Sequence, residues 1–221
     1  MQARNVNLKS FVARLALTAA LSLLIALPVA AQSGGNIPDD YYRAEIVILE
    51  RLVDPDTITE QMAGKTIEPL EPAKLRMWVE DANGNVSTDL RLVPTGELHL
   101  SSAIDRLERS GKYRVLASAG WYEAFPPDYQ GEPLQVETGE WLPAARQHSV
   151  EGRITIDRQR FLHVDVQLNH WQVDEVAMPP APLELITWIR ETRRMRSEEI
   201  HFIDSPTIGV LVFFKKIEAE G

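Results

Sequence analysis

The stretch "VEGRITIDRQRFLHVDVQLNHW", residues 150–171, decides the fold class of this chain. On each side of the polar turn "DRQR" (157–160), apolar and polar side chains alternate with a period of two. That period is typical of a β-strand with one face on a core and the other in water. Two such arms joined by a short turn predict an antiparallel hairpin. The sequence therefore predicts an antiparallel sheet with one solvated face.

Further strands are predicted on both sides of this hairpin. They are "YYRAEIVILERL" (41–52), "YRVLASAGWYEAF" (113–125), "LELITWIRETRRMR" (183–196) and "IGVLVFFKKI" (208–217). The first and the last carry apolar residues at both odd and even positions. Because a strand shows alternate residues to opposite faces, these two strands are expected to be covered on both sides, as in the middle of a sheet.

One amphipathic helix is predicted within "ELHLSSAIDRLERSGKY", residues 97–113. Its apolar residues follow the i, i+3, i+4, i+7 spacing of a helix stripe: Leu100, Ala103, Ile104 and Leu107. Ser101 or Ser102 is expected to cap its start, and Gly111 to take the left-handed conformation after its end. Residues 54–95 lack periodicity and predict a loop-rich connection with a short helix at 73–79, and 126–149 are expected to be irregular.

These elements predict an α+β fold in which an antiparallel sheet of about five to six strands carries one main helix packed on one face. A single domain is expected over residues 41–221. Before it, residues 1–31 combine a basic start, the apolar run "LALTAALSLLIAL" and small residues at a cleavage position. This is the pattern of a secretory signal peptide, and the apolar run is too short to span a bilayer. Residues 32–40, "QSGGNIPDD", are expected to form a flexible linker.

Charge and cysteine content limit the class of function. The chain has no cysteine and a formal charge of −9, which becomes −12 once the signal peptide with its three basic residues is removed. A surface this acidic argues against nucleic acid as the main partner. No disulfide framework and no lipid-modified cysteine are possible. A protein exported without a membrane anchor, in the periplasm, is the expectation.

No pattern typical of an enzyme or a metal site is present. The chain contains no nucleophile elbow, phosphate loop or complete calcium loop. His163 and His170 lie on one predicted strand at an odd spacing, so they face opposite sides of a sheet and cannot share an ion. We therefore expect a non-catalytic protein without a cofactor or metal.

The densest cationic cluster lies at the end of the predicted strand 183–196, with arginines at 190, 193, 194 and 196. From the residues alone, two interpretations of this cluster are about equally favoured. In one, the arginines form ion pairs with neighbouring acids. In the other, they form an anion site, because guanidinium groups suit carboxylates and phosphates. Trp121, Trp141, Trp171 and Trp188 are candidates for stacking on sugars, although burial in the core is the stronger alternative for tryptophan.

The stretch "RRMRSEEIHFIDSPTIGVLV", 193–212, resembles the C-terminal motif of the CsiV family of periplasmic peptidoglycan-binding proteins. The matching residues are Arg193, Arg194, Met195, Arg196, Ser197, Glu199, His201, Asp204, Pro206 and Gly209. The segments "RFLHVDV", "YRVLASAGW" and "YRAEIVILE" are similar to the same family, so the likeness covers most of 42–53 and 98–217. Ser205 and Ser118 stand where the family pattern has histidine.

The resemblance implies a periplasmic protein that binds peptidoglycan and supports cell-wall synthesis by a class A penicillin-binding protein through its outer-membrane lipoprotein activator. The predicted ligand-binding residues are His163, Trp188, Arg193, Arg194, Arg196, His201 and Asp204. A protein-docking factor without glycan affinity of its own is the alternative function.

Overall fold

The fold is taken from a computed structural model that describes residues 38, 40–53, 57–58, 62, 65–67, 73–173 and 183–218. The predicted signal peptide and all but two residues of the predicted linker lie outside these residues. Within the described part of the chain, no helix is long and apolar enough to cross a membrane.

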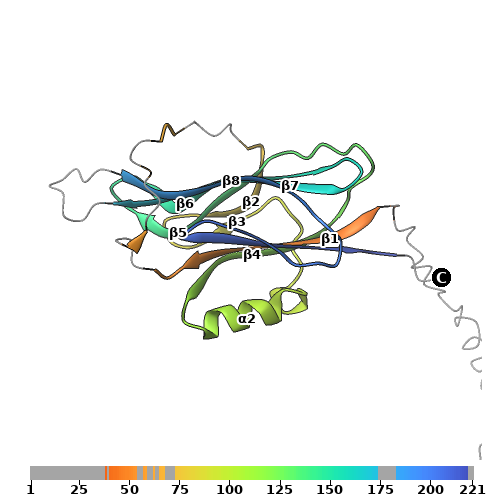
Figure 1. The fold of residues 1–221 in the computed structure, drawn as a ribbon, viewed down its shortest axis with the longest axis horizontal. Coiled ribbons are helices and arrows are strands. Elements are labelled where there is room, and N and C mark those ends of the chain that lie inside the picture. The colour runs from red at the N-terminus through yellow and green to blue at the C-terminus, as the bar shows by residue number, and fades with distance from the viewer. Residues whose placement is uncertain are drawn as a thin grey trace, which may run out of the picture. The chain divides into compact units, whose positions relative to one another are not determined.

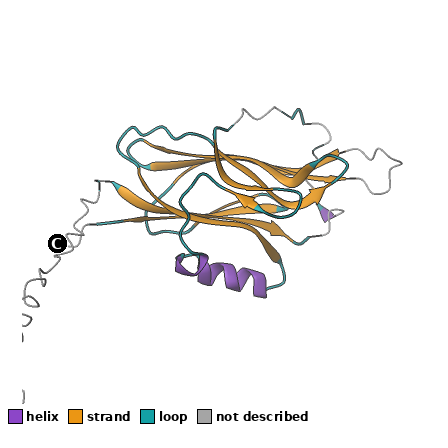
Figure 2. Ribbon diagram, turned by 180° about the vertical axis from the view of Figure 1, so that it is seen from behind, coloured by secondary structure: helices purple, strands orange, loops and turns teal. Residues whose placement is uncertain are grey.

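Two β-sheets face each other (Figure 1, Figure 2). The first has the strand order β4-β1-β10-β9, formed by Tyr113–Ala124, Tyr41–Arg51, Ile208–Lys216 and His201–Asp204. The second has the order β3-β2-β5-β6-β7-β8, formed by Val86–Ser87, Leu75–Glu80, Leu134–Leu142, Gln147–Arg158, Leu162–Val173 and Leu183–Arg194. All neighbours pair antiparallel except β2 and β5, which are parallel.

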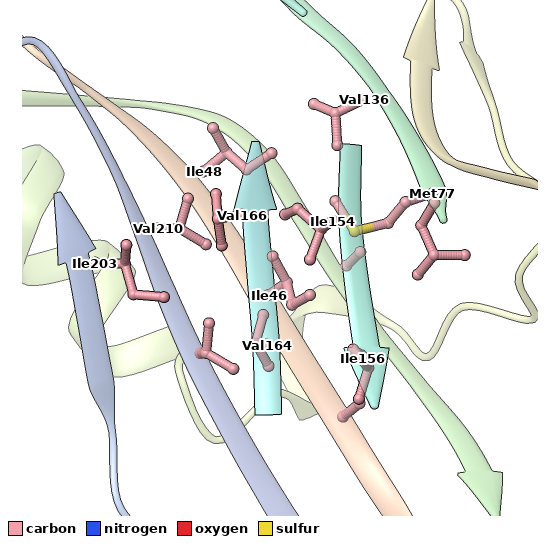
Figure 3. Close-up of a cluster of buried hydrophobic side chains, with 14 of the residues drawn as sticks. Ile46, Ile48, Met77, Val136, Ile154, Ile156, Val164, Val166, Ile203 and Val210 are labelled. Carbon is pink, nitrogen blue, oxygen red and sulfur yellow. The ribbon is translucent and has the colours of Figure 1, made fainter. Parts of the chain in front are cut away.

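The main core fills the space between the two sheets (Figure 3). Ile46 and Ile48 of β1 meet Val164 and Val166 of β7 there, and each is fully buried. The other residues labelled in Figure 3 are Met77, Val136, Ile154, Ile156, Ile203 and Val210. Burial of these side chains, at roughly 25 cal/mol per Å² of apolar surface, is the main force that holds the sheets together.

A second, smaller core lies on the other side of the four-stranded sheet. There the helix α2, Ser101–Arg109, packs on Val47 and Leu49 of β1 through Leu100 and Ile104. β1 and β10 therefore carry apolar residues on both faces because each face has its own cover. A short 3-10 helix, η2 (Thr95–Glu97), precedes α2.

The start of α2 is held by a buried carboxylate from β1. Glu45 is fully buried, and its two oxygens accept hydrogen bonds from the backbone N–H groups of His99 and Leu100, each at 3.0 Å. Arg43 Nε lies 2.7 Å from Glu45 Oε1, although its N–H is not directed for a hydrogen bond. The carboxylate satisfies donors that the first turn of a helix leaves unpaired, and its charge suits the helix dipole.

The predicted strands at 41–52, 113–125, 183–196 and 208–217, the hairpin and the helix are all confirmed, with small differences at their ends. The left-handed Gly111 is confirmed as well, with φ of 66°. The single sheet was wrong, because the strands divide between two sheets and the fold is richer in β-structure than predicted. The short helix expected at 73–79 is strand β2, and the stretch expected to be irregular contains β5.

The predicted serine caps were wrong. The helix has Leu100 as its N-cap, without a side-chain capping hydrogen bond from within the segment. Glu45, more than fifty residues earlier in the chain, supplies the acceptors instead, and a local sequence motif cannot reveal such a partner.

Replacing Glu45 with alanine should lower the free energy of unfolding by about 2–4 kcal/mol, because it removes two charge-assisted hydrogen bonds and leaves Arg43 without its buried counter-charge. Urea unfolding followed by circular dichroism measures this. Glu132→Ala is the control, since the Glu132 side chain is 52% exposed and forms a surface ion pair with Lys74, so its loss should cost less than about 1 kcal/mol. Equal effects of the two substitutions would contradict the capping role.

Candidate functional site on the outer face of the six-stranded sheet

The outer face of the six-stranded sheet is polar, and its residues alternate with the core residues of β7 and β8. Val164, Val166 and Leu168 are fully buried between the sheets, so their neighbours on β7 point the other way. Paired residues of antiparallel strands share a face. The outward pairs of β7 and β8 are His163 with Arg194, Asp165 with Thr192, Gln167 with Arg190, and Asn169 with Trp188. We call these pairs, with Arg153 and Glu151 of β6, the outer face.

Hydrogen bonds join the outer-face side chains into two networks. In one, Glu151 accepts from Asn169 at 2.7 Å and from the indole N–H of Trp171 at 3.0 Å, while Arg190 donates to Asn169 at 2.5 Å. In the other, Asp165 accepts from Thr192 at 2.6 Å and from Gln167 at 2.8 Å, and Arg153 donates to Gln167 at 3.2 Å. Held amide, carboxylate and guanidinium groups of this kind can exchange hydrogen bonds with the hydroxyl and amide groups of a ligand.

An aromatic ring borders each end of this polar area. At one end, the guanidinium of Arg190 lies 5.0 Å from the centre of the Trp188 ring, and Lys65 Nζ lies 6.0 Å from it. At the other end, Arg160 and Arg194 lie 5.4 and 4.8 Å from the centre of the Phe161 ring. Trp188 and Arg194 are six positions apart on β8, a span of roughly 20 Å at 3.3–3.4 Å per strand residue.

The structure brings together only part of the predicted site. His163 and Arg194 are partners in the β7–β8 ladder, beside the turn that carries Phe161. Arg196 lies just after β8, where its backbone N–H donates to Nε2 of His201 at 3.0 Å and its side chain reaches Glu199 at 3.5 Å. These four residues therefore lie at one end of the sheets, which we call the arginine end.

The three remaining predicted residues lie elsewhere. Arg193 belongs to the opposite face of β8 from Arg194, where it pairs with Glu191 at 2.6 Å and donates to the backbone oxygen of Phe202 on β9. It thereby bridges the two sheets. Trp188 lies at the far end of the outer face, and Asp204, at the far end of β9 from His201, pairs with Arg51 at 2.9 Å. The ion-pair interpretation of the cluster thus describes Arg193 and Arg196, and Arg194 has no acidic partner among the described residues.

Two residues of the site escaped the sequence analysis. Arg160 and Phe161 lie in the β6–β7 turn. They open the family-like segment "RFLHVDV", but they were not predicted to bind a ligand. The available signal was their place in that segment, whereas the 39% exposure of Phe161 is seen only in the structure. Of the four candidate tryptophans, Trp121 is buried in the core, as the stronger alternative held, and Trp171 and Trp188 contribute to the outer face.

A cavity of about 340 Å³ lies at the end of the sheets opposite to the arginine end, lined among others by Glu140, Ser149, His170 and Thr207. His170 Nδ1 lies 2.7 Å from the hydroxyl of Thr207, which lies 2.5 Å from that of Thr187. Ser205 extends this chain, 3.1 Å from Thr187. Ser205, where the resemblance led us to expect histidine, thus joins a chain of hydroxyl groups. Ser118, the other such position, has a buried hydroxyl without a hydrogen-bond partner among the described residues.

His163 and His170 point to opposite sides of β7, as their spacing predicted, since His170 bonds to Thr207 between the sheets and His163 belongs to the outer face. Across the described ranges, no group of three or more His, Asp or Glu side chains is arranged to hold a metal ion.

Comparison with known proteins gives one match. The family model described as "Peptidoglycan-binding protein, CsiV" matches residues 13–217, which is nearly the whole chain. No curated protein and no solved structure matches this chain. The family match covers both sheets, α2 and all the residues of the candidate site.

Acidification should destabilise the protein through His170. Burial, with a smaller effect of the nearby Arg114 charge, lowers the pKa of His170 from 6.5 to about 4. Between these values the unfolded chain binds a proton that the folded chain does not, so stability is present above pH 6.5 and is lost as the pH falls to 4. The pKa difference corresponds to about 3 kcal/mol.

The measurement is urea unfolding at several pH values from 7 to 4, for the wild type and His170→Gln. Glutamine cannot titrate, so the wild type should lose about 3 kcal/mol more than the variant over this range. Parallel pH profiles for the two proteins would show that His170 is not the group responsible.

Proposed function

Because this chain belongs to the CsiV family, described as peptidoglycan-binding proteins, we propose that it binds peptidoglycan through the outer face of β6, β7 and β8. One structural observation supports the choice of this surface. The outer face lies on the side of the sheet away from the core, and its amides, carboxylates and guanidinium groups are already held by hydrogen bonds, with an aromatic ring at each end. Asn169 is buried within this network, and most of the groups around it are partly exposed. A polymer of sugars and short peptides offers hydroxyl, amide and carboxylate groups that complement such a surface.

The binding is proposed to be non-catalytic. In support, the family is described as peptidoglycan-binding, and the hydroxyl of Thr192 donates to Asp165, which also accepts from Gln167 within the network. The carboxylates Glu151 and Asp165 are each engaged in two hydrogen bonds from neighbours. Such engagement suits groups that position a ligand.

The cellular role that we propose follows the family resemblance and the N-terminal sequence. The protein acts in the periplasm after removal of residues 1–31. There it supports wall synthesis by a class A penicillin-binding protein, either directly or through the outer-membrane lipoprotein activator of that enzyme. Capture experiments with the purified mature protein and each candidate partner, with and without peptidoglycan fragments, test this role. Capture of neither partner under both conditions would remove it.

Trp188→Ala should weaken retention on purified, protein-free sacculi about tenfold, because loss of the ring removes one border of the outer face and the surface on which Arg190 and Lys65 lie. Co-sedimentation of residues 32–221 at low and physiological salt, over a range of sacculus concentrations, measures the effect. Trp141→Ala is the matched control, because Trp141 is also half-buried but lies on β5 against His148, and it should bind as the wild type does.

The same assay separates this proposal from the two rivals. Wild-type protein that stays in the supernatant at both salt concentrations would leave the docking factor without glycan affinity as the function. Soluble muropeptides released during the incubation would indicate a hydrolase. Equal losses for the two tryptophan variants would move the binding surface away from Trp188.

A further inference from the structure

We infer that the arginine end contains a carboxylate-binding clamp, formed by Arg160, Phe161 and Arg194, which takes the free carboxylates of peptidoglycan stem peptides. This inference rests on the proposed function, because it assigns the chemical group that one end of the outer face recognises.

The first supporting observation is the way in which the two guanidinium groups are held. Arg160 and Arg194 come from different elements, the β6–β7 turn and the end of β8, and both lie over the ring of Phe161, at 5.4 and 4.8 Å from its centre. Cation–π contact restricts each side chain while its N–H groups stay free to donate. Groups that are already restricted lose less conformational entropy when they bind a ligand.

The second observation is that neither of these charges is neutralised. Most other arginines near the arginine end contact an acid: Arg158 pairs with Asp40 at 2.9 Å, Arg193 with Glu191 and Arg196 with Glu199. No acidic side chain of the described residues pairs with Arg160 or Arg194, and both are exposed. Two uncompensated positive charges therefore lie close together on a chain with a net charge of −9, and they complement an anionic ligand.

The third observation identifies the kind of anion. Phe161 is 39% exposed, so the clamp offers an apolar surface beside its two cations. A carboxylate that carries a small apolar side chain, such as a terminal alanine of a stem peptide, can bond to the guanidinium groups and pack its methyl group on the ring. A fully hydrated inorganic anion would leave the ring unused.

The position of the clamp also fits a branched polymer. Arg194 lies on the same face of β8 as Thr192, Arg190 and Trp188, so a ligand can contact the polar networks and the clamp at once. Sugar units on the networks would place a peptide branch within reach of the clamp, which lies roughly 20 Å from Trp188 along the strand.

The test is a cycle that combines substitutions in the protein with chemical modification of the ligand. Wild type, Arg160→Ala/Arg194→Ala and the control Arg106→Ala/Arg109→Ala are each sedimented with native sacculi and with sacculi whose carboxyl groups have been converted to amides. The control removes the same charge from exposed positions of α2, on the outer side of the other sheet. Melting curves establish that all three proteins fold alike.

We expect amidation to weaken wild-type binding about tenfold and the clamp substitutions to weaken binding to native sacculi by a similar factor. The clamp variant should lose nothing more on amidated sacculi, because the two changes remove the same interaction. The control variant should behave as the wild type with both ligands. Arg160→Lys/Arg194→Lys keeps the charge without the planar fork and should fall between the wild type and the alanine variant.

Three results would overturn the inference. Wild-type binding that does not change on amidation would exclude carboxylates as the recognised group. Equal losses for the clamp and control variants would reduce the effect to net charge. Clamp and wild-type proteins that bind native sacculi equally would place the site elsewhere while leaving peptidoglycan binding intact, whereas a wild type that binds neither preparation would remove the proposed function itself.

Discussion

The arrangement of the two sheets and α2 depends on β1 and β10, which are buried on both faces. Both strands lie inside the four-stranded sheet and carry apolar residues on each face. One face of these strands is covered by the six-stranded sheet, and the other is covered by α2. The four-stranded sheet therefore has an apolar cluster on each of its two faces. Among the described residues, the core between the sheets covers the inner side of the six-stranded sheet, and the alternating strands keep polar residues on the other side. The binding surface that we propose is thus a consequence of which strands are apolar on both faces.

The parts that the sequence predicted well are those with strong local periodicity. The hairpin, the two-sided strands and α2 each have a repeat that specifies the type of element. The division into two sheets was missed because pairing between distant segments, such as β1 with β10, leaves no local signal. β2 and β5 were missed for a related reason: each contains a register irregularity, between Arg76 and Trp78 in β2 and between Thr138 and Trp141 in β5, which interrupts the alternation that reveals a strand.

Buried polar groups explain much of the structure that the sequence analysis did not predict. Glu45 and the chain from His170 through Thr207 and Thr187 are buried, where an unpaired polar group is costly. Each is satisfied by a partner from another element, α2 for Glu45 and the β9–β10 connection for His170. Such pairs fix the position of a helix or the end of a strand pair, so they specify geometry as well as contribute stability.

The arginine cluster at the end of β8 shows how alternation divides one run of sequence between two roles. Arg193 and Arg194 are adjacent in the chain and identical in chemistry, yet they point to opposite faces of the strand. Arg193 forms an ion pair with Glu191 and donates a hydrogen bond to the backbone of β9, so its charge is paired where it bridges the two sheets. Arg194 turns to the outer face, where Phe161 holds it without an acidic partner. Dense positive charge beside the most buried strands is therefore reasonable: the core keeps β8 in place, and the strand's alternation turns Arg194 to the outer face.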